Sequence, residues 1–245
     1  MTEPVGDDRR QAELVTALGA VRARIADACA AVGRDPQEVT LVAVTKTYPA
    51  ADVLTLARLG VHDIGESRDQ EASGKVDEIA QAAPDVAGVL RWHFVGRLQS
   101  RKCRSVASYA SAVHSLDRPE LAAKLASGVE RAGRDPLDVF VQLSLDADPD
   151  RGGVPVDRVA EVADAVAAHD HLRLRGIMAV PPMDADPDAA FATVAEVSRR
   201  LQRDHPEADA ISAGMSADLT EAIRHGSTHV RVGTALLGRR DPTFG

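Results

Sequence analysis

One lysine in this chain has a position that suits covalent chemistry. Only four of the 29 basic residues are lysines, and Lys46 ends an apolar segment, 39–46, that is typical of a buried strand. A lysine amine can lose its proton and attack a carbonyl, whereas a guanidinium keeps its charge. Lys46 is therefore a candidate for forming a Schiff base, and the alternative is a solvated side chain at a strand end.

Small and hydroxyl-bearing residues near the end of the sequence have the pattern of a phosphate site. Met215 and Ser216 follow one apolar segment, and Gly233 and Thr234 follow the next. Loops after neighbouring parallel strands present backbone N–H groups that bind phosphate, and glycine lets the ligand approach closely. The carboxylate of Asp218 would compete for the same N–H groups. The alternative is that Ser216 only caps a helix and Gly233 only forms a turn.

An arginine lies inside the last apolar segment. Arg231 stands between Val230 and Val232, where a buried guanidinium is costly unless it meets an acceptor. The acceptor is either a structural carboxylate, such as Glu66, or an electronegative ring atom of a ligand. A reactive lysine, a phosphate site and an inward arginine together predict a phosphorylated aldehyde with a pyridine nitrogen, which is pyridoxal 5′-phosphate (PLP).

The rest of the sequence predicts a framework that brings strand ends together. Apolar, β-branched segments alternate with segments of helical periodicity, which favours parallel strands joined by crossover helices. The predicted strands cover 39–46, 61–66, 92–96, 112–116, 139–145, 172–180, 210–215 and 229–232. The predicted helices between them cover 51–59, 70–82, 100–107, 119–132, 155–168, 188–204 and 217–225. Eight strands in 245 residues predict an α/β fold, a (β/α)8 TIM barrel, and an open doubly wound sheet is the alternative.

An extra helix is predicted before the first strand. Apolar residues recur there at spacings of three and four, which marks one face that packs on a larger body. They are Leu14, Leu18, Val21, Ile25, Ala28 and Val32. Residues 1–10 are polar and predicted to be disordered. Because no low-complexity linker interrupts the chain, residues 1–245 are predicted to form a single domain.

The composition excludes several classes of protein. The net charge of −8 argues against a nucleic-acid partner. No segment reaches the roughly 18 apolar residues that a membrane helix needs, and the first residues lack the apolar core of a signal peptide. These observations predict a cytoplasmic protein with no membrane partner. Cys29 and Cys103 are too few for a disulfide framework, and no metal site is expected. His93, inside the third predicted strand, either approaches the cofactor or forms a hydrogen bond in the core, and the second is the expectation.

Several motifs stand at the predicted strand ends. They are Val44-Thr45-Lys46, Gly65-Glu66-Ser67-Arg68, Trp92-His93-Phe94-Val95-Gly96, Gly176-Ile177-Met178-Ala179-Val180-Pro181-Pro182, Gly214-Met215-Ser216-Ala217-Asp218 and Val230-Arg231-Val232-Gly233-Thr234. In this order they resemble the pyridoxal phosphate homeostasis proteins (the YggS/PROSC family). The resemblance covers nearly the whole chain, and it rests on the motifs together rather than on any one of them.

The resemblance implies a barrel like the N-terminal domain of alanine racemase, with PLP as its cofactor. It assigns six residues to PLP: Lys46, Met215, Ser216, Arg231, Gly233 and Thr234. By this assignment Lys46 forms the Schiff base, Arg231 faces the pyridine nitrogen, and the other four hold the phosphate. A cation beside the ring nitrogen disfavours its protonation, which makes the cofactor a weaker electron sink.

The sequence departs from the family pattern at three places. Ser67 and Arg101 each stand where the family usually has asparagine, and the segment 148–153 is only loosely similar. None of these positions is among the six residues assigned to PLP. The departures therefore affect peripheral contacts rather than cofactor binding.

The resemblance implies a non-catalytic function. The expected protein is a monomer that stores or buffers PLP inside the cell, or delivers it to PLP-dependent apo-enzymes. The alternative is an amino-acid racemase-like enzyme, which needs acid–base groups on both faces of the cofactor. Related racemases carry a further β-rich domain that supplies a tyrosine; here no such domain is expected, and neither Tyr48 nor Tyr109 is a convincing second group. An aldolase that uses Lys46 on a sugar phosphate would not account for Arg231.

Overall fold

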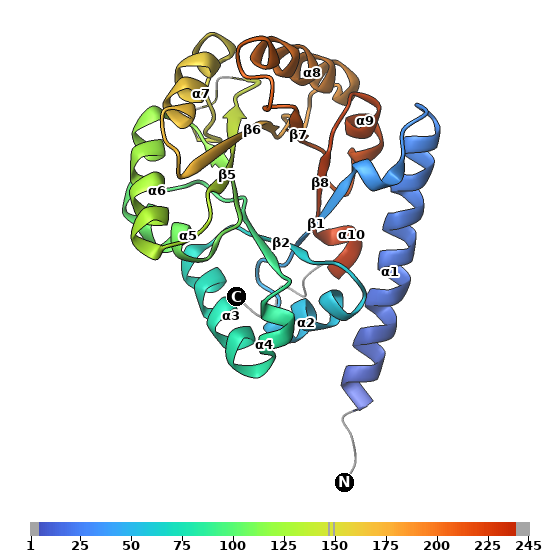
Figure 1. The fold of residues 1–245 in the computed structure, drawn as a ribbon. Coiled ribbons are helices and arrows are strands. Elements are labelled where there is room, and N and C mark those ends of the chain that lie inside the picture. The colour runs from blue at the N-terminus through green and yellow to red at the C-terminus, as the bar shows by residue number, and fades with distance from the viewer. Residues whose placement is uncertain (1–4, 147, 149, 239–245) are drawn as a thin grey trace.

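Eight parallel strands close into a barrel in the computed structural model of this chain (Figure 1). The structure describes residues 5–146, 148 and 150–238. The strands are β1 (Thr40–Val44), β2 (Asp63–Glu66), β3 (Arg91–Phe94), β4 (Ala112–Leu116), β5 (Leu137–Leu143), β6 (Leu172–Ala179), β7 (Ala210–Ser212) and β8 (His229–Val232). All eight predicted strands are present, because each apolar segment is buried between the barrel interior and the surrounding helices.

The pairing of the last strand with the first decides between the two predicted architectures. β8 lies parallel to β1, with Thr40 opposite His229 and Ala43 opposite Val232. The strands follow one another around the barrel in sequence order. An open doubly wound sheet has two unpaired edges and lacks such a closing pair, so this alternative is wrong and the predicted (β/α)8 barrel is confirmed.

Helices surround the barrel (Figure 1). They are α1 (Val5–Ala30), α2 (Ala50–Arg58), α3 (Asp69–Ala82), α4 (Pro84–Ala87), α5 (Cys103–Tyr109), α6 (Pro119–Ala132), α7 (Val159–Ala167), α8 (Pro187–Asp204), α9 (Leu219–Arg224) and α10 (Thr234–Leu237). Every predicted helix is present, while the short helices α4 and α10 were not predicted. The end of α6 illustrates how the sequence sets these boundaries: Gly133 has a φ of 61°, a left-handed conformation that suits glycine and ends the helix before β5.

The predicted N-terminal helix is present but has different ends. Helix α1 packs against α9 and α10, and its apolar face is buried from Leu14 to Ala28. It ends at Ala30, so Val32 lies beyond it and is 39% exposed. The predicted disorder of residues 1–10 is wrong for residues 5–10, which are helical. Arg10 explains part of this order, because its guanidinium pairs with Asp52 at 2.7 Å. Residues 1–4 lie outside the described part of the chain.

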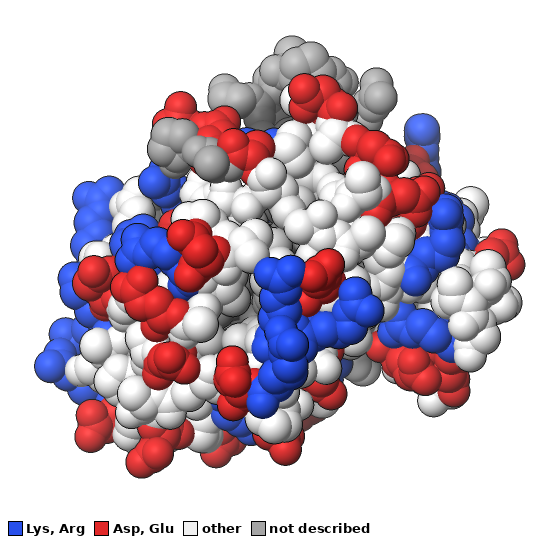
Figure 2. Space-filling view, turned by 90° about the horizontal axis from the view of Figure 1, so that it is seen from above, with Lys and Arg blue, Asp and Glu red and all other residues white. Residues whose placement is uncertain are grey.

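Charged side chains cover the outside of the molecule. On the face shown in Figure 2, basic and acidic side chains are intermixed among uncharged ones. The net charge of the whole chain is −8. In the described parts of the chain, no helix has both the length and the hydropathy to cross a membrane.

Candidate functional site

A cavity of about 540 Å³ at the carboxyl ends of β1 and β8 contains Lys46. Its lining consists of Val44, Lys46, Thr47, Tyr48, Gly233, Thr234 and Gly238. Because β1 and β8 are paired neighbours, the residues that follow the two strands meet at the same rim of the barrel. The structure thus brings together Lys46, Gly233 and Thr234, and the Lys46 side chain is exposed.

The residue that follows Lys46 has an unusual backbone. Thr47 has a φ of 73° and is the only non-glycine residue with a positive φ in the described part of the chain. This conformation is strained for a β-branched side chain, and strained residues cluster at functional sites. The backbone N–H of Thr47 donates a hydrogen bond to Glu71 Oε1. A side chain of α3 therefore holds the loop that carries Lys46.

A second lysine organises this loop from the inside. The Lys75 ammonium is buried and lies 2.7 Å from Glu66 Oε1 and 2.9 Å from Glu71 Oε1. It also donates to the backbone carbonyl of Thr45 at 2.8 Å. The Thr45 hydroxyl donates to the same Glu66 oxygen at 2.6 Å. Lys75 thus links β2, α3 and the residue that precedes Lys46.

The two carboxylates around Lys75 respond differently to their surroundings. Burial raises the pKa of Glu66, and the hydrogen bonds from Lys75 and Thr45 only partly offset it. Burial also acts to raise the pKa of the less buried Glu71, but the hydrogen bonds from Lys75 and Thr47 lower it overall. Glu71 is therefore the carboxylate better suited to stay charged beside the Lys46 loop.

The sequence analysis did not assign Thr47, Glu71 or Lys75 to the site. A signal for one contact is present in the sequence, because Glu71 and Lys75 are four residues apart on a predicted helix, the spacing of a helical ion pair. Nothing local indicates that Glu71 also reaches the backbone of Thr47, which precedes it by 24 positions.

Arg231 is buried in the barrel interior, and its partners are neutral. Its Nη1 donates to the carbonyl and the hydroxyl of Ser212 at 2.7 and 2.6 Å, and its Nη2 donates to the carbonyl of Ala179 at 2.9 Å. The alternative that Arg231 pairs with Glu66 is wrong, because Glu66 is bound to Lys75. Burial lowers the pKa of Arg231 to about 10, and Asp218 partly offsets this effect. The guanidinium carries more N–H donors than these three contacts use.

The loops after β7 and β8 contact each other through Ser216. The Ser216 hydroxyl accepts a hydrogen bond from the backbone N–H of Ala235 at 3.1 Å. The N–H of Met215 is engaged by Asp218 Oδ1 at 2.6 Å, so the competition expected from Asp218 does occur at Met215. Within the described residues, no acceptor is found for the backbone N–H of Ser216 or of Thr234. These two N–H groups are available to an anion.

Gly233 brings the loop after β8 close to β1. A Cβ atom on Gly233 would lie 3.4 Å from the backbone oxygen of Val44, so the two chain segments are in van der Waals contact. This contact places the N–H groups at the start of α10 beside the loop that carries Lys46. Met215 and Ser216 do not line the cavity, although Ser216 is hydrogen-bonded to α10 at its rim.

The remaining residues from the sequence analysis lie away from this cavity. His93 is buried and hydrogen-bonded to Asp63 and His114, as expected for a core histidine. Arg101 is exposed and donates to Gln99 at 2.9 Å. Ser67 is half-buried, and its backbone packs closely on Gly96, where a Cβ atom would lie 2.0 Å from the backbone oxygen of Ser67. In the part of the chain that the structure describes, no cluster of side chains is suited to a metal ion.

Comparison with known proteins identifies the class of barrel. Residues 17–241 match the family described as "Alanine racemase, N-terminal domain". A pyridoxal phosphate homeostasis protein from Mycobacterium leprae (strain TN) is 45% identical over 240 residues, which covers 94% of this chain and 93% of the relative. One from Escherichia coli (strain K12) is 37% identical over 231 residues, covering 91% and 95% of the two chains. The chain therefore belongs to the pyridoxal phosphate homeostasis protein family, as the motifs predict.

A solved structure agrees with this assignment. PipY of Synechococcus elongatus, determined with PLP bound, is 30% identical and superposes with a TM-score of 0.75. The similarity covers 87% of this chain and 100% of the PipY chain. Both the fold and the sequence thus relate this chain to a barrel whose structure has been determined with PLP bound.

Proposed function

We propose that this chain binds PLP in the cavity around Lys46 and serves PLP homeostasis. The observation that carries the proposal is the exposed Lys46 in a cavity that Gly233 and Thr234 also line. Membership of the family and the similarity to PLP-bound PipY support it. The Lys46 amine would condense with the aldehyde of PLP, forming a C=N bond with loss of water.

The other predicted residues fit the rest of the cofactor. The free N–H groups of Ser216 and Thr234 suit the phosphate, and Gly233 lets it approach the backbone. Met215 is the weaker candidate, because Asp218 must first release its N–H. Arg231 has donors to spare and no carboxylate partner among the described residues, which suits an uncharged pyridine nitrogen. Bound PLP supplies an electron-withdrawing ring, and a donor-only cation beside its nitrogen weakens that withdrawal.

We further propose that the protein is not an enzyme but a cytoplasmic, monomeric carrier that stores or buffers PLP or delivers it to apo-enzymes. Two tyrosines are the candidates for a second acid–base group, and neither suits the role. The Tyr48 hydroxyl, at the cavity, donates to the carbonyl of Gly238 at 2.8 Å. Tyr109 is buried elsewhere, and burial raises the pKa of its hydroxyl far above the ordinary value. A racemase-like activity would need a second acid–base group that exchanges a proton with the substrate.

Reduction with borohydride tests the covalent bond. We expect the purified protein with PLP to absorb visible light, and we expect borohydride to fix the cofactor on Lys46. The Lys46→Ala variant should lose both the visible band and the trapped adduct, because no amine remains in the cavity. Lys124→Ala is the matched control, since Lys124 is exposed on α6 and its removal should change neither. Peptide mass spectrometry after reduction locates the adduct.

Two results would contradict the proposal. If the wild-type protein binds no PLP at a saturating concentration of PLP, the proposed function is ruled out. Fast racemisation of alanine or serine by the PLP-loaded protein, measured by chiral chromatography, would leave the cofactor site intact and replace the carrier function with the racemase-like alternative.

A further inference from the structure

Five polar side chains form a continuous line across the barrel interior, from the start of β2 to β8. Asp63 Oδ1 lies 2.9 Å from His93 Nε2, and His93 Nδ1 lies 2.8 Å from His114 Nε2. On the other side of the barrel, His114 Nδ1 lies 2.8 Å from the Ser212 hydroxyl, which lies 2.6 Å from Arg231 Nη1. Each distance is that of a hydrogen bond.

The two ends of this line determine where every proton lies. Arg231 can only donate, so the Ser212 oxygen accepts from it and the Ser212 proton points to His114 Nδ1. At the other end, ionised Asp63 can only accept, so His93 donates through Nε2. The proton between the rings must then lie on His114 Nε2, donating to His93 Nδ1. Each ring donates once and accepts once, as a neutral imidazole does.

The surroundings of His114 favour its neutral state. His114 is fully buried and stacks on Phe140 with ring centroids 4.4 Å apart. Burial lowers its pKa well below 6.5, and the charged state of His93 would lower it further. His229 packs on the edge of Phe140, and burial lowers the pKa of His229 to about 4. His114, at the centre of the line, is therefore expected to be uncharged at neutral pH.

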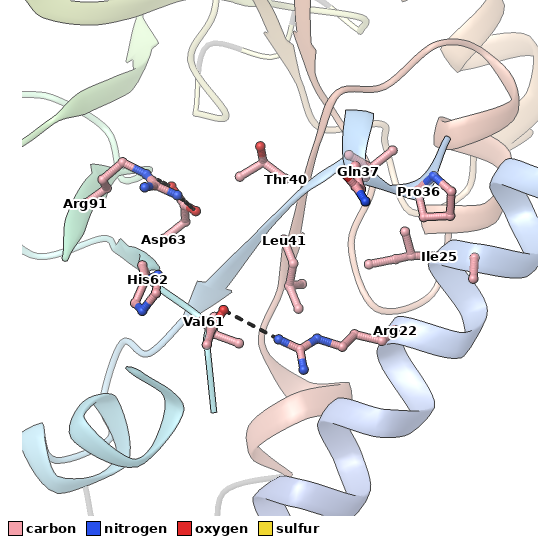
Figure 3. Close-up of a pocket in the computed structure, with 13 residues that line it drawn as sticks. Arg22, Ile25, Pro36, Gln37, Thr40, Leu41, Val61, His62, Asp63 and Arg91 are labelled. Carbon is pink, nitrogen blue, oxygen red and sulfur yellow. Dashed lines mark hydrogen bonds and ion pairs between the residues drawn. The ribbon is translucent and has the colours of Figure 1, made fainter. Parts of the chain in front are cut away.

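The line ends at Asp63, at the amino end of β2, whereas Lys46 follows the carboxyl end of the neighbouring strand β1. Asp63 accepts hydrogen bonds from Arg91 Nε and Nη2. Both residues line a cavity of about 640 Å³ between α1 and the amino ends of β1 and β2. Figure 3 shows the Asp63–Arg91 pair on one side of this cavity and Arg22 on the other. Arg91 thus holds the Asp63 carboxylate in place, and the same carboxylate accepts the hydrogen bond from His93 Nε2.

We propose that Asp63, His93, His114 and Ser212 act as positioning residues that hold the Arg231 guanidinium in the orientation that faces the PLP ring nitrogen. The inference rests on the proposed function, because it concerns the same cofactor. With its own proton directed to His114 Nδ1, the Ser212 hydroxyl presents a lone pair to Arg231. If that acceptor is removed, the hydroxyl proton can turn toward Arg231 and repel its N–H. The anchor at Asp63 gives the line one direction and excludes the reversed arrangement of protons.

A pair of substitutions at His114 tests the inference. His114→Phe removes both ring nitrogens and packs on Phe140, whereas His114→Gln keeps one donor and one acceptor at similar positions. We expect His114→Phe to weaken PLP binding about tenfold or more, the effect of one charge-assisted hydrogen bond, and to shift the visible absorption band. His114→Gln should restore both properties to within about twofold. Ser212→Ala, which removes only a hydroxyl, should act in the same direction as His114→Phe.

Different results separate this inference from the proposed function. If Arg231→Gln shifts the absorption band but His114→Phe and Ser212→Ala do not, the positioning role is wrong and the PLP site stands. If none of the three shifts the band, Arg231 does not face the ring and both assignments fail. A loss of thermal stability in His114→Phe with an unchanged band would mean a purely structural role.

Nitrogen NMR of the histidines gives a readout that does not depend on the cofactor. In the protein without PLP, at neutral pH, we expect His93 and His114 both to carry their proton on Nε2. A proton on Nδ1 of either ring, or a doubly protonated ring, would overturn the proposed direction of the line and with it the role of the four residues.

Discussion

At the scale of single residues, the loop that carries Lys46 depends on charges that the loop itself does not contain. Thr47 keeps a positive φ because Glu71 accepts a hydrogen bond from its backbone, and Lys75 holds Glu71 in place. Lys75 also neutralises Glu66, which is 1% exposed. A buried ion pair adds little net stability, but removing one partner leaves the other charge uncompensated.

We expect Lys75→Met to lower the free energy of unfolding by about 3 kcal/mol, because the Glu66 carboxylate is left buried without its partner. PLP binding should weaken as well, since Glu71 and Thr47 lose their support. Urea unfolding of the protein without PLP measures the first effect. Lys124→Met is the control, with a change within about 0.5 kcal/mol expected for an exposed position. Adding Glu66→Gln should recover part of the loss; no recovery would contradict the role given to this pair.

At the scale of elements, two loops from adjacent strands form one rim. The loop after β7 approaches α9 so closely that Gly214 has no room for a side chain. A Cβ atom there would lie 2.6 Å from Ala222 Cβ and 3.1 Å from Leu219 Cα. Gly214 also has a φ of 89°, which side chains rarely adopt. This glycine therefore lets the chain turn tightly before it presents the N–H of Ser216.

We expect Gly214→Ala to lower the free energy of unfolding by about 2 kcal/mol, from backbone strain and the clash with α9. It should also weaken PLP binding, because the Ser216 N–H moves with the loop. Thermal unfolding and spectroscopic titration with PLP measure the two effects. Gly19→Ala is a matched control, because Gly19 is exposed on α1 with nothing near its Cβ position. Alanine favours the helix more than glycine does, so the free energy of unfolding should rise by up to about 1 kcal/mol. Equal behaviour of the two variants would argue against a tight loop.

At the scale of the whole molecule, the barrel joins two ends that differ in chemistry. The carboxyl ends of the strands carry Lys46 and the free N–H groups, whereas the amino ends carry the Asp63–Arg91 pair and the cavity below α1. The stability of the closed barrel depends on both ends, because every strand pairs with two neighbours. A charge at the amino end therefore contributes to the free energy of unfolding of the entire domain.

Asp63 makes that contribution depend on pH. Burial acts to raise its pKa, but hydrogen bonds from His93 and Arg91 lower it from 3.8 to about 2. Because the folded form binds the proton less tightly than the unfolded form, the charged Asp63 stabilises the fold above about pH 4, and this stabilisation is lost as the pH falls towards 2.

We expect Asp63→Asn to cost about 2 kcal/mol at pH 7 and to make the loss of stability between pH 4 and 2 shallower. Urea unfolding at a series of pH values measures both. Asp27→Asn, at an exposed position on α1, serves as the control and should follow the wild-type curve. If Asp63→Asn shows the wild-type slope, Asp63 is not the group that titrates in this window.

The sequence was sufficient for properties that depend on local pattern. Apolar segments and helical periodicity placed all eight strands and the helices between them, because burial on one or both faces leaves a regular mark in the chain. The position of Lys46 after the first strand and of the glycine and hydroxyl residues after the last two also followed from this order. Residues 5–10 were misjudged, since the contact of Arg10 with Asp52 is not visible in a polar segment.

Only the tertiary structure decided which side chains meet. Closure of the barrel followed from the pairing of β8 with β1, and the acceptors of Arg231 proved to be Ser212 and Ala179 rather than Glu66. His114 and Ser212 are 98 positions apart in the chain and share a hydrogen bond. Such contacts depend on the register and tilt of strands that are far apart in the chain, and no local sequence pattern records them.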